Sequence, residues 1–179
     1  MKELNHGILV SKLARALGEA LGLDENTCYE LSVAGLLHDI GKLQLVSYLG
    51  NSEEDENPLV VQEVKFVRMH SELGYNALKE QGYSDFILDC VHYHHENYDG
   101  SGYPSSLRGT EIPLGARIIR ICDMFAALRS DRPYSRALDT AGALRTTIDE
   151  VRFFDMEVFL AFQNVVHHKN YEAREFLHI

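Results

Sequence analysis

Apolar residues recur at spacings of three and four positions along almost the whole chain, and the strict alternation typical of β-strands is hard to find. This period matches one face of an α-helix, so the pattern predicts an all-α protein, a single bundle of about seven helices. The first four predicted helices are residues 5–22, a stretch that ends at Gly41, a stretch from Pro58 through Leu73, and residues 84–97. The last three are a stretch after Pro113 that contains Asp123, residues 140–151, and residues 155–167.

Two segments interrupt this helical pattern. Residues 47–58 are polar, acidic and rich in turn formers, which predicts a surface loop. Residues 99–104 read Asp-Gly-Ser-Gly-Tyr-Pro, and the glycines and proline there exclude regular secondary structure.

Length and charge narrow the class of protein. With 179 residues, 45% of them hydrophobic, the chain is long enough for one compact domain and short for two, so we expect a single domain over 1–179. The formal net charge of −10 does not favour binding to long nucleic acids or to an anionic membrane surface. An anionic substrate would have to be held locally, by metal ions or a few cations.

The chain also lacks the signs of export. No apolar run approaches the roughly 20 residues of a membrane-spanning helix, so we expect no membrane segment. Its cysteines, Cys28, Cys90 and Cys122, are far apart and form no CxxC pair. This pattern indicates reduced thiols and a cytoplasmic location.

Five histidines and two aspartates lie at positions that helical periodicity turns toward the core. His38, for example, follows Leu31 by seven residues and Ala34 by four, so it shares their buried face. The full set is His6, His38, Asp39, His70, His94, His95 and Asp123.

Each of these residues alone could be a core residue that is hydrogen-bonded to a carbonyl group or to water. Unpaired buried polar groups cost roughly 1 to 3 kcal/mol each, however, so a marginally stable domain needs compensation for seven of them. Metal coordination would provide it. A mixed set of imidazoles and carboxylates favours iron or manganese, with zinc as an alternative, over magnesium.

The spacing favours two ions. Neighbouring side chains such as His38 and Asp39 point about 100° apart on a helix, which suits two adjacent ions better than one. We therefore predict Asp39 as a bridging ligand. We assign His6, His38 and Asp123 to one ion, and the remaining three histidines, His70, His94 and His95, to the other. Two ions roughly 3.5 to 4 Å apart can hold a bridging hydroxide and neutralise a phosphate ester, so the predicted reaction is phosphoester hydrolysis.

Several motifs stand in a fixed order over about 6–162 and together closely resemble the HD-GYP family. They are His38-Asp39-Ile40-Gly41-Lys42, His94-His95-Glu96, Asp99 to Pro104, Ile112-Pro113 and Arg132-Pro133-Tyr134. The resemblance implies a helical domain of the HD superfamily with two or three metal ions, usually iron or manganese. It further implies hydrolysis of cyclic di-GMP to pGpG or GMP, with metal ligands at the same seven positions.

The resemblance also implies roles for other residues. Lys42 would lie beside the reacting phosphodiester, and we predict it, with Asp39, as catalytic; a plain surface lysine is the alternative. Arg132 would clamp a phosphate, unless its role is structural, and Arg136 is a further substrate-binding candidate. Gly102, Tyr103 and Pro104 would shape the substrate mouth or contact a signalling partner, although a tight turn alone could require them.

The chain departs from the family pattern in ways that bear on activity. Lys2 stands where members with a third metal ion have glutamate, so we expect two ions. Ala126 replaces a common second aspartate, and Ser135 replaces a basic residue. The segment around Glu53 to Glu56 replaces the usual linker. Slower turnover or a different substrate would follow from these changes.

Two other functions therefore stay open beside cyclic di-GMP hydrolysis. One is a signalling module that binds a cyclic dinucleotide, or a partner protein, with little or no hydrolysis. The other is the same metal chemistry on another nucleotide phosphoester. A homodimer is compatible with either.

Overall fold

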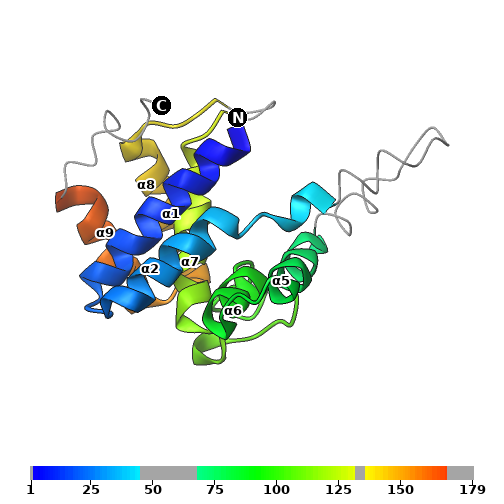
Figure 1. The fold of residues 1–179 in the computed structure, drawn as a ribbon. Coiled ribbons are helices and arrows are strands. Elements are labelled where there is room, and N and C mark those ends of the chain that lie inside the picture. Colours follow the sequence, from blue (N-terminus) through cyan, green and yellow to red (C-terminus); the bar gives the residue numbers. More distant parts are fainter. Residues whose placement is uncertain (1, 45–67, 132–135, 169–179) are drawn as a thin grey trace.

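The computed structural model describes residues 2–44, 68–131 and 136–168 (Figure 1). Within these ranges it contains α-helices and two short 3₁₀ helices and no strand, which confirms the predicted all-α class. The α-helices that the described residues delimit fully are α1 (Lys2–Ala20), α2 (Glu25–Leu37), α5 (His70–Glu80), α6 (Asp85–Tyr93), α7 (Leu114–Leu128), α8 (Thr140–Asp149) and α9 (Met156–His168). The 3₁₀ helices are Gly109–Glu111 and Val151–Phe153.

Helix α7 lies at the centre of the bundle and packs against α1, α2, α6, α8 and α9 (Figure 1). Its apolar residues point in several directions, and Ala116, Ile118, Ile119 and Ile121 are fully buried. A helix that is apolar on most of its sides is one that is covered on most of its sides. Phe125 of α7 packs edge-to-face on Phe162 of α9 in the same core.

Helices α1 and α2 run side by side, and a close approach between them sets the position of the first histidines (Figure 1). Asp24 caps α2 by accepting a hydrogen bond from the backbone N–H of Thr27 at 3.1 Å. At Gly35 an added Cβ would lie 2.9 Å from the backbone of Ser11. Glycine at this position therefore lets α2 approach α1 closely enough for His38 to meet His6.

A second close approach joins the end of the α2 region to the start of α5. A Cβ added at Gly41 would lie 2.0 Å from the carbonyl oxygen of His70 and 2.6 Å from the backbone nitrogen of Gly74. A larger residue at 41 would push α5 away. This glycine thus brings His70 next to the segment that carries Asp39.

Two predicted helix ends, both at candidate ligands, were wrong. The helix predicted to reach Gly41 ends at Leu37, and the helix predicted to reach Asn97 ends at Tyr93. His38 and His94 are therefore the C-cap residues of α2 and α6 rather than members of the helices. The helix predicted from Pro58 through Leu73 was also placed wrongly at its end, because α5 runs from His70 to Glu80. The four remaining predicted helices differ from the observed ones by at most a few residues at either end.

Some expectations fall on other parts of the chain. The start of the predicted third helix at Pro58 and the loop at 47–58 lie outside the described residues. Cys28, Cys90 and Cys122 are free and buried, as expected for reduced thiols. None of the described helices is both long enough and apolar enough to cross a membrane.

Candidate metal centre

Seven side chains that are scattered over the sequence meet where five segments converge. His6 projects from α1, and His70 is the first residue of α5. The two doublets, His38-Asp39 and His94-His95, occupy the turns that follow α2 and α6, and Asp123 lies on α7. The structure therefore brings together all the residues that the sequence nominates as metal ligands. Their role as ligands stays a prediction.

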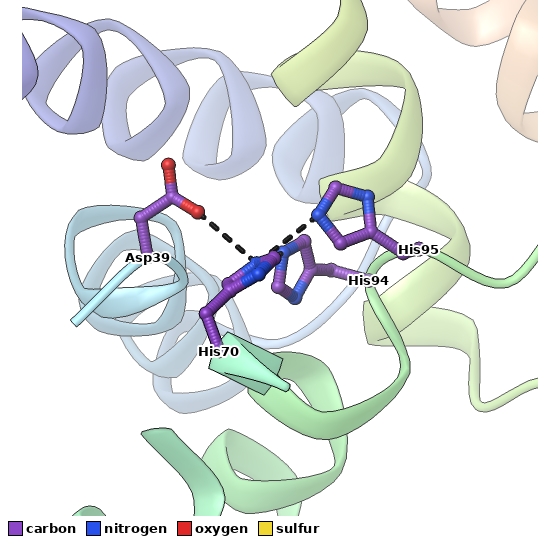
Figure 2. A group of neighbouring side chains, drawn as sticks. All are labelled: Asp39, His70, His94 and His95. Atoms are coloured by element: carbon purple, nitrogen blue, oxygen red, sulfur yellow. Dashed lines mark hydrogen bonds and ion pairs between the residues drawn. The ribbon is translucent and has the colours of Figure 1, made fainter. Parts of the chain in front are cut away.

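One group of donors surrounds His70. Asp39, His70, His94 and His95 each offer one ligand atom, and these four atoms all lie within 4.8 Å of one another (Figure 2). The His70 Nε2 lies 3.2 Å from the Nε2 of His94, 3.1 Å from that of His95 and 3.3 Å from Asp39 Oδ1. Three imidazoles and a carboxylate thus converge on one point.

A second group lies on the other side of Asp39. His6, His38 and Asp39 also have ligand atoms within 4.8 Å of one another. Asp123 Oδ1 lies 3.0 Å from His6 Nε2 and 3.6 Å from His38 Nε2. Asp39 belongs to both groups, because its Oδ1 faces His70 while its Oδ2 lies 3.3 Å from His38 Nε2. This grouping has the composition of the predicted partition, with Asp123 beside His6, and the assignment of an ion to each group stays a prediction.

The turns after α2 and α6 orient their first histidines in the same way. The His38 Nδ1 lies 2.8 Å from the carbonyl oxygen of Gly35, and the His94 Nδ1 lies 2.7 Å from that of Val91. A carbonyl oxygen can only accept, so Nδ1–H is the donor in both cases. When either ring is neutral, its lone pair is therefore on Nε2, which faces the centre and can bind a metal ion.

The residues fit metal ions because a buried carboxylate oxygen and several imidazole nitrogens face one another. Among the described residues, Asp39 Oδ1 is buried and has no hydrogen-bond partner, although His70 Nε2 lies only 3.3 Å away. Buried polar atoms without a partner are rare, and a cation placed among these donors would satisfy them together. Imidazole nitrogen with carboxylate oxygen is a donor set suited to iron, manganese or zinc.

The two groups differ in their electrostatics. Burial disfavours the charged form of His38, but the carboxylates of Asp123 and Asp39 outweigh burial and raise the pKa of His38 to about 10. Burial opposes ionisation of Asp39 and Asp123 as well, yet hydrogen bonds and charge from His38 keep the pKa of both carboxyls well below the ordinary value. This side is a network of ion pairs.

In the group that contains His94 and His95, burial has the largest effect on the pKa values. It lowers the pKa of His95 to about 3, and the pKa of His94 also lies well below the ordinary value because burial and the neighbouring imidazoles disfavour a charge. Both rings are therefore neutral near pH 7, the form in which histidine binds metals.

Lys42 lies at the edge of the centre. Its ammonium donates to Asp39 Oδ2 at 2.6 Å, and its side chain is 39% exposed. A cation in this place can contact both the shared carboxylate and a ligand that enters from solvent. The role of Lys42 beside the substrate stays a prediction.

The Gly102-Tyr103-Pro104 segment supports a candidate ligand. The Tyr103 ring stacks on the His95 imidazole with centroids 4.7 Å apart, and the Arg68 guanidinium lies 5.1 Å from the centre of the Tyr103 ring. Fully buried Glu96 fixes the end of this segment by accepting hydrogen bonds from the backbone N–H groups of Ser105 and Leu107. The segment therefore positions His95.

Other predicted residues are placed less informatively. Arg132 and Ser135 lie outside the described residues, as do the side chain of Lys2 and the acidic stretch near Glu53. Arg136 is exposed. Ala126 is fully buried in the core face of α7.

Sequence reasoning missed Arg120, which lines a cavity beside the centre. The cavity has a volume of about 460 Å³ and is lined by His95, Arg120, Asp123, Met124, Ala127, Leu128, Ser130 and Leu138. One signal could have found this residue. Arg120 interrupts an otherwise apolar stretch of α7 and precedes Asp123 by three residues, a spacing that places two side chains on one helix face.

Comparison with known proteins agrees with this site. The model of the HD domain family matches residues 2–158, and the chain belongs to that family. It is 36% identical over 162 residues to the cyclic di-GMP phosphodiesterase PA4108 of Pseudomonas aeruginosa, a match that covers 90% of this chain and 38% of that protein. It is 32% identical over 156 residues to the 3'3'-cGAMP-specific phosphodiesterase 1 of Vibrio cholerae, covering 86% of this chain and 36% of that protein.

These matches confirm the resemblance seen in the motifs, although the chain spans well under half the length of these relatives. Solved structures support the fold. An HDG"Y"P protein from Bdellovibrio bacteriovorus superposes with a TM-score of 0.70 at 19% identity, covering 92% of this chain and 52% of that chain. The HD domain of the phosphodiesterase PgpH from L. monocytogenes gives a TM-score of 0.70 at 18% identity, covering 97% of this chain and 93% of that chain.

Proposed function

We propose that this domain is a metal-dependent phosphodiesterase that hydrolyses a cyclic dinucleotide, with cyclic di-GMP as the first candidate substrate and pGpG or GMP as the product. The observation that carries the proposal is the pair of donor groups that share Asp39. The names of the relatives support the substrate class, since they include phosphodiesterases for cyclic di-GMP and for 3'3'-cGAMP.

The proposed roles follow from the positions of the side chains. His70, His94 and His95 would hold one ion, and His6, His38 and Asp123 the other, with Asp39 shared; iron or manganese is the first expectation and zinc the alternative. When bound, two such ions activate water and neutralise the oxygens of a phosphate under attack. Lys42, at the solvent edge, would hold a phosphate oxygen of the substrate through its ammonium group.

The test is to incubate the iron- or manganese-loaded protein with cyclic di-GMP and to separate the linear products by chromatography. We expect product with the wild-type protein and none above background with Asp39→Ala. His92→Ala is the matched control, because His92 lies between Tyr75 and Tyr93 rather than among the candidate ligands. Absence of product with every divalent metal tried, or full activity in Asp39→Ala, would contradict the proposal.

A second candidate substrate has a specific basis. Relatives that match most of this chain include 3'3'-cGAMP-specific enzymes of Vibrio cholerae. Values of kcat/KM for cyclic di-GMP, 3'3'-cGAMP and cyclic di-AMP would rank the substrates. If the nucleotide binds but no linear product forms, the domain is a binding module instead.

A further inference from the structure

We propose that Arg120 recognises a guanine base of the substrate in the cavity beside the metal centre. This inference rests on the proposed function, because it assigns the cavity to the nucleotide. It goes further by naming the residue that selects the base.

The cavity connects Arg120 to the candidate metal ligands. His95 and Asp123 line the same space of about 460 Å³, which is in the range of roughly 300 to 1,000 Å³ that small-molecule sites occupy. A substrate whose phosphodiester lies against the metal centre therefore extends the rest of the molecule into contact with Arg120.

Within the described residues, no carboxylate pairs directly with the charge of Arg120. Among the described residues its guanidinium forms no ion pair, whereas Arg117, on the same helix, is paired with Asp155. In the described part of the chain its only hydrogen bond runs from Nε to Asn97 Oδ1, at 2.9 Å. Two terminal nitrogens, each with N–H donors, are left for a ligand in the cavity.

The Asp99–Ser101 turn holds Arg120 in place through Asn97. The Asn97 amide donates to Ser101 Oγ at 3.0 Å, and Ser101 Oγ donates to Asp99 Oδ1 at 2.6 Å. The Arg120 guanidinium also lies 5.8 Å from the centre of the Phe154 ring. Because Asn97 and Phe154 both restrain it, the fork of N–H groups is oriented before the ligand arrives, which lowers the entropic cost of binding.

The rest of the cavity suits a flat base better than a second phosphate. Met124, Ala127, Leu128 and Leu138 contribute apolar side chains, and Met124 lies one turn from Arg120 on α7. An apolar wall with a few directed polar groups is the usual form of a site for an organic ring. Two parallel N–H groups of arginine match the O6 and N7 acceptors of guanine, whereas adenine places an amino donor at the corresponding position.

The experiment compares cyclic di-GMP with cyclic di-AMP in wild type, Arg120→Ala, Arg120→Lys and the control Arg145→Ala, which alters an exposed arginine of α8. The measured quantity is the ratio of kcat/KM for the two substrates. That ratio is insensitive to the fraction of folded enzyme, because both substrates meet the same preparation. Binding of both nucleotides to chelator-treated protein, by calorimetry, gives a second readout that needs no turnover.

We expect Arg120→Ala to reduce the preference for cyclic di-GMP roughly 10-fold or more, the scale of a bidentate arginine contact with guanine. Arg120→Lys keeps the positive charge but loses the paired N–H groups of the guanidinium, so it should lose part of the preference for cyclic di-GMP. Arg145→Ala should leave that preference unchanged. An equal fall for both substrates would overturn the inference in favour of a phosphate contact or a structural role. An unchanged ratio, or no binding of either nucleotide, would also overturn it.

These outcomes separate the inference from the proposed function. Guanine-selective binding that depends on Arg120, without hydrolysis, would refute the enzyme and keep the base contact. Hydrolysis with an unchanged preference for cyclic di-GMP in Arg120→Ala would support the proposed enzyme and refute the contact between Arg120 and the base.

Discussion

The two halves of the candidate metal centre share Asp39 but differ in charge. On one side His6, His38 and Asp123 form a network of ion pairs, in which the carboxylates raise the pKa of His38 to about 10. On the other side three imidazoles crowd together, and burial lowers the pKa of His95 to about 3. His94 and His95 are therefore neutral near pH 7, whereas His38 must lose a proton before it can bind a cation.

Because the two groups of candidate ligands differ in charge, we expect them to bind metal ions with different affinities. Metal binding to the half that contains His38 would release the proton of His38, whereas His94 and His95 in the other half are already neutral near pH 7. Asp39 lies between the halves, so a change there affects both. The predictions below separate the halves, beginning with the largest expected effect.

Removing one candidate ligand from each half should remove one ion at a time. We expect His94→Ala and Asp123→Ala each to lower the metal content by about one ion per chain. Loss of a residue that only supports a metal ligand lowers activity by roughly 10- to 100-fold. We expect a larger fall in kcat when the ligand itself is removed. Elemental analysis and kcat measurements on the two variants check this. If either variant kept the full metal content, its residue would not be a ligand.

Loss of the ring that supports His95 should have a smaller effect. Tyr103→Ala removes the stacked ring beside that imidazole, so we expect a fall in kcat/KM of roughly 10- to 100-fold, with both ions still bound at saturating metal. Tyr103→Phe keeps the stacked ring and is the matched control. An unaffected Tyr103→Ala enzyme would show that the stacking does not position His95.

The pH dependence of stability should differ between the halves in the metal-free protein. The pKa values of His94 and His95 are lower in the folded state, so the unfolded chain binds more protons below about pH 6.5, and stability falls as the pH decreases. The pKa of His38 is raised, so its contribution is fully present below about pH 6.5 and is lost as the pH rises toward 10.

Thermal unfolding of chelator-treated protein between pH 5 and pH 9 tests this expectation. We expect the highest Tm near pH 6.5, a shallower acid slope in His95→Ala and a shallower alkaline slope in His38→Ala. A Tm that stays flat over this range would contradict the assigned charge states.

Proton release on metal binding is the smallest effect. Calorimetric titration at pH 7.5 in buffers of different ionisation enthalpy should detect close to one proton released, and His38→Ala should reduce that number. Release that is unchanged in His38→Ala would place the proton elsewhere.

The sequence predicts much of this arrangement, for physical reasons. Apolar periodicity identifies the helices because burial follows the helical period. The same test nominates His38 and His70, which are buried, and Asp123, which is partly buried. The motifs add the order of the ligands and the position of Lys42.

The spacing of apolar residues does not predict features that depend on hydrogen bonds and contacts of polar side chains. The helices end before His38 and His94, where each ring bonds a carbonyl oxygen of the preceding turn, and apolar spacing does not encode this interaction. Arg120 was missed because its position depends on Asn97 and Phe154, which only tertiary structure brings to α7.

The most direct test of the central claim is the metal content of the purified protein after reconstitution with iron or manganese. Two ions per wild-type chain, two in His92→Ala and fewer than one in Asp39→Ala are the results we predict. A wild-type chain that binds no transition metal, or an Asp39→Ala chain that keeps two ions, would contradict the account.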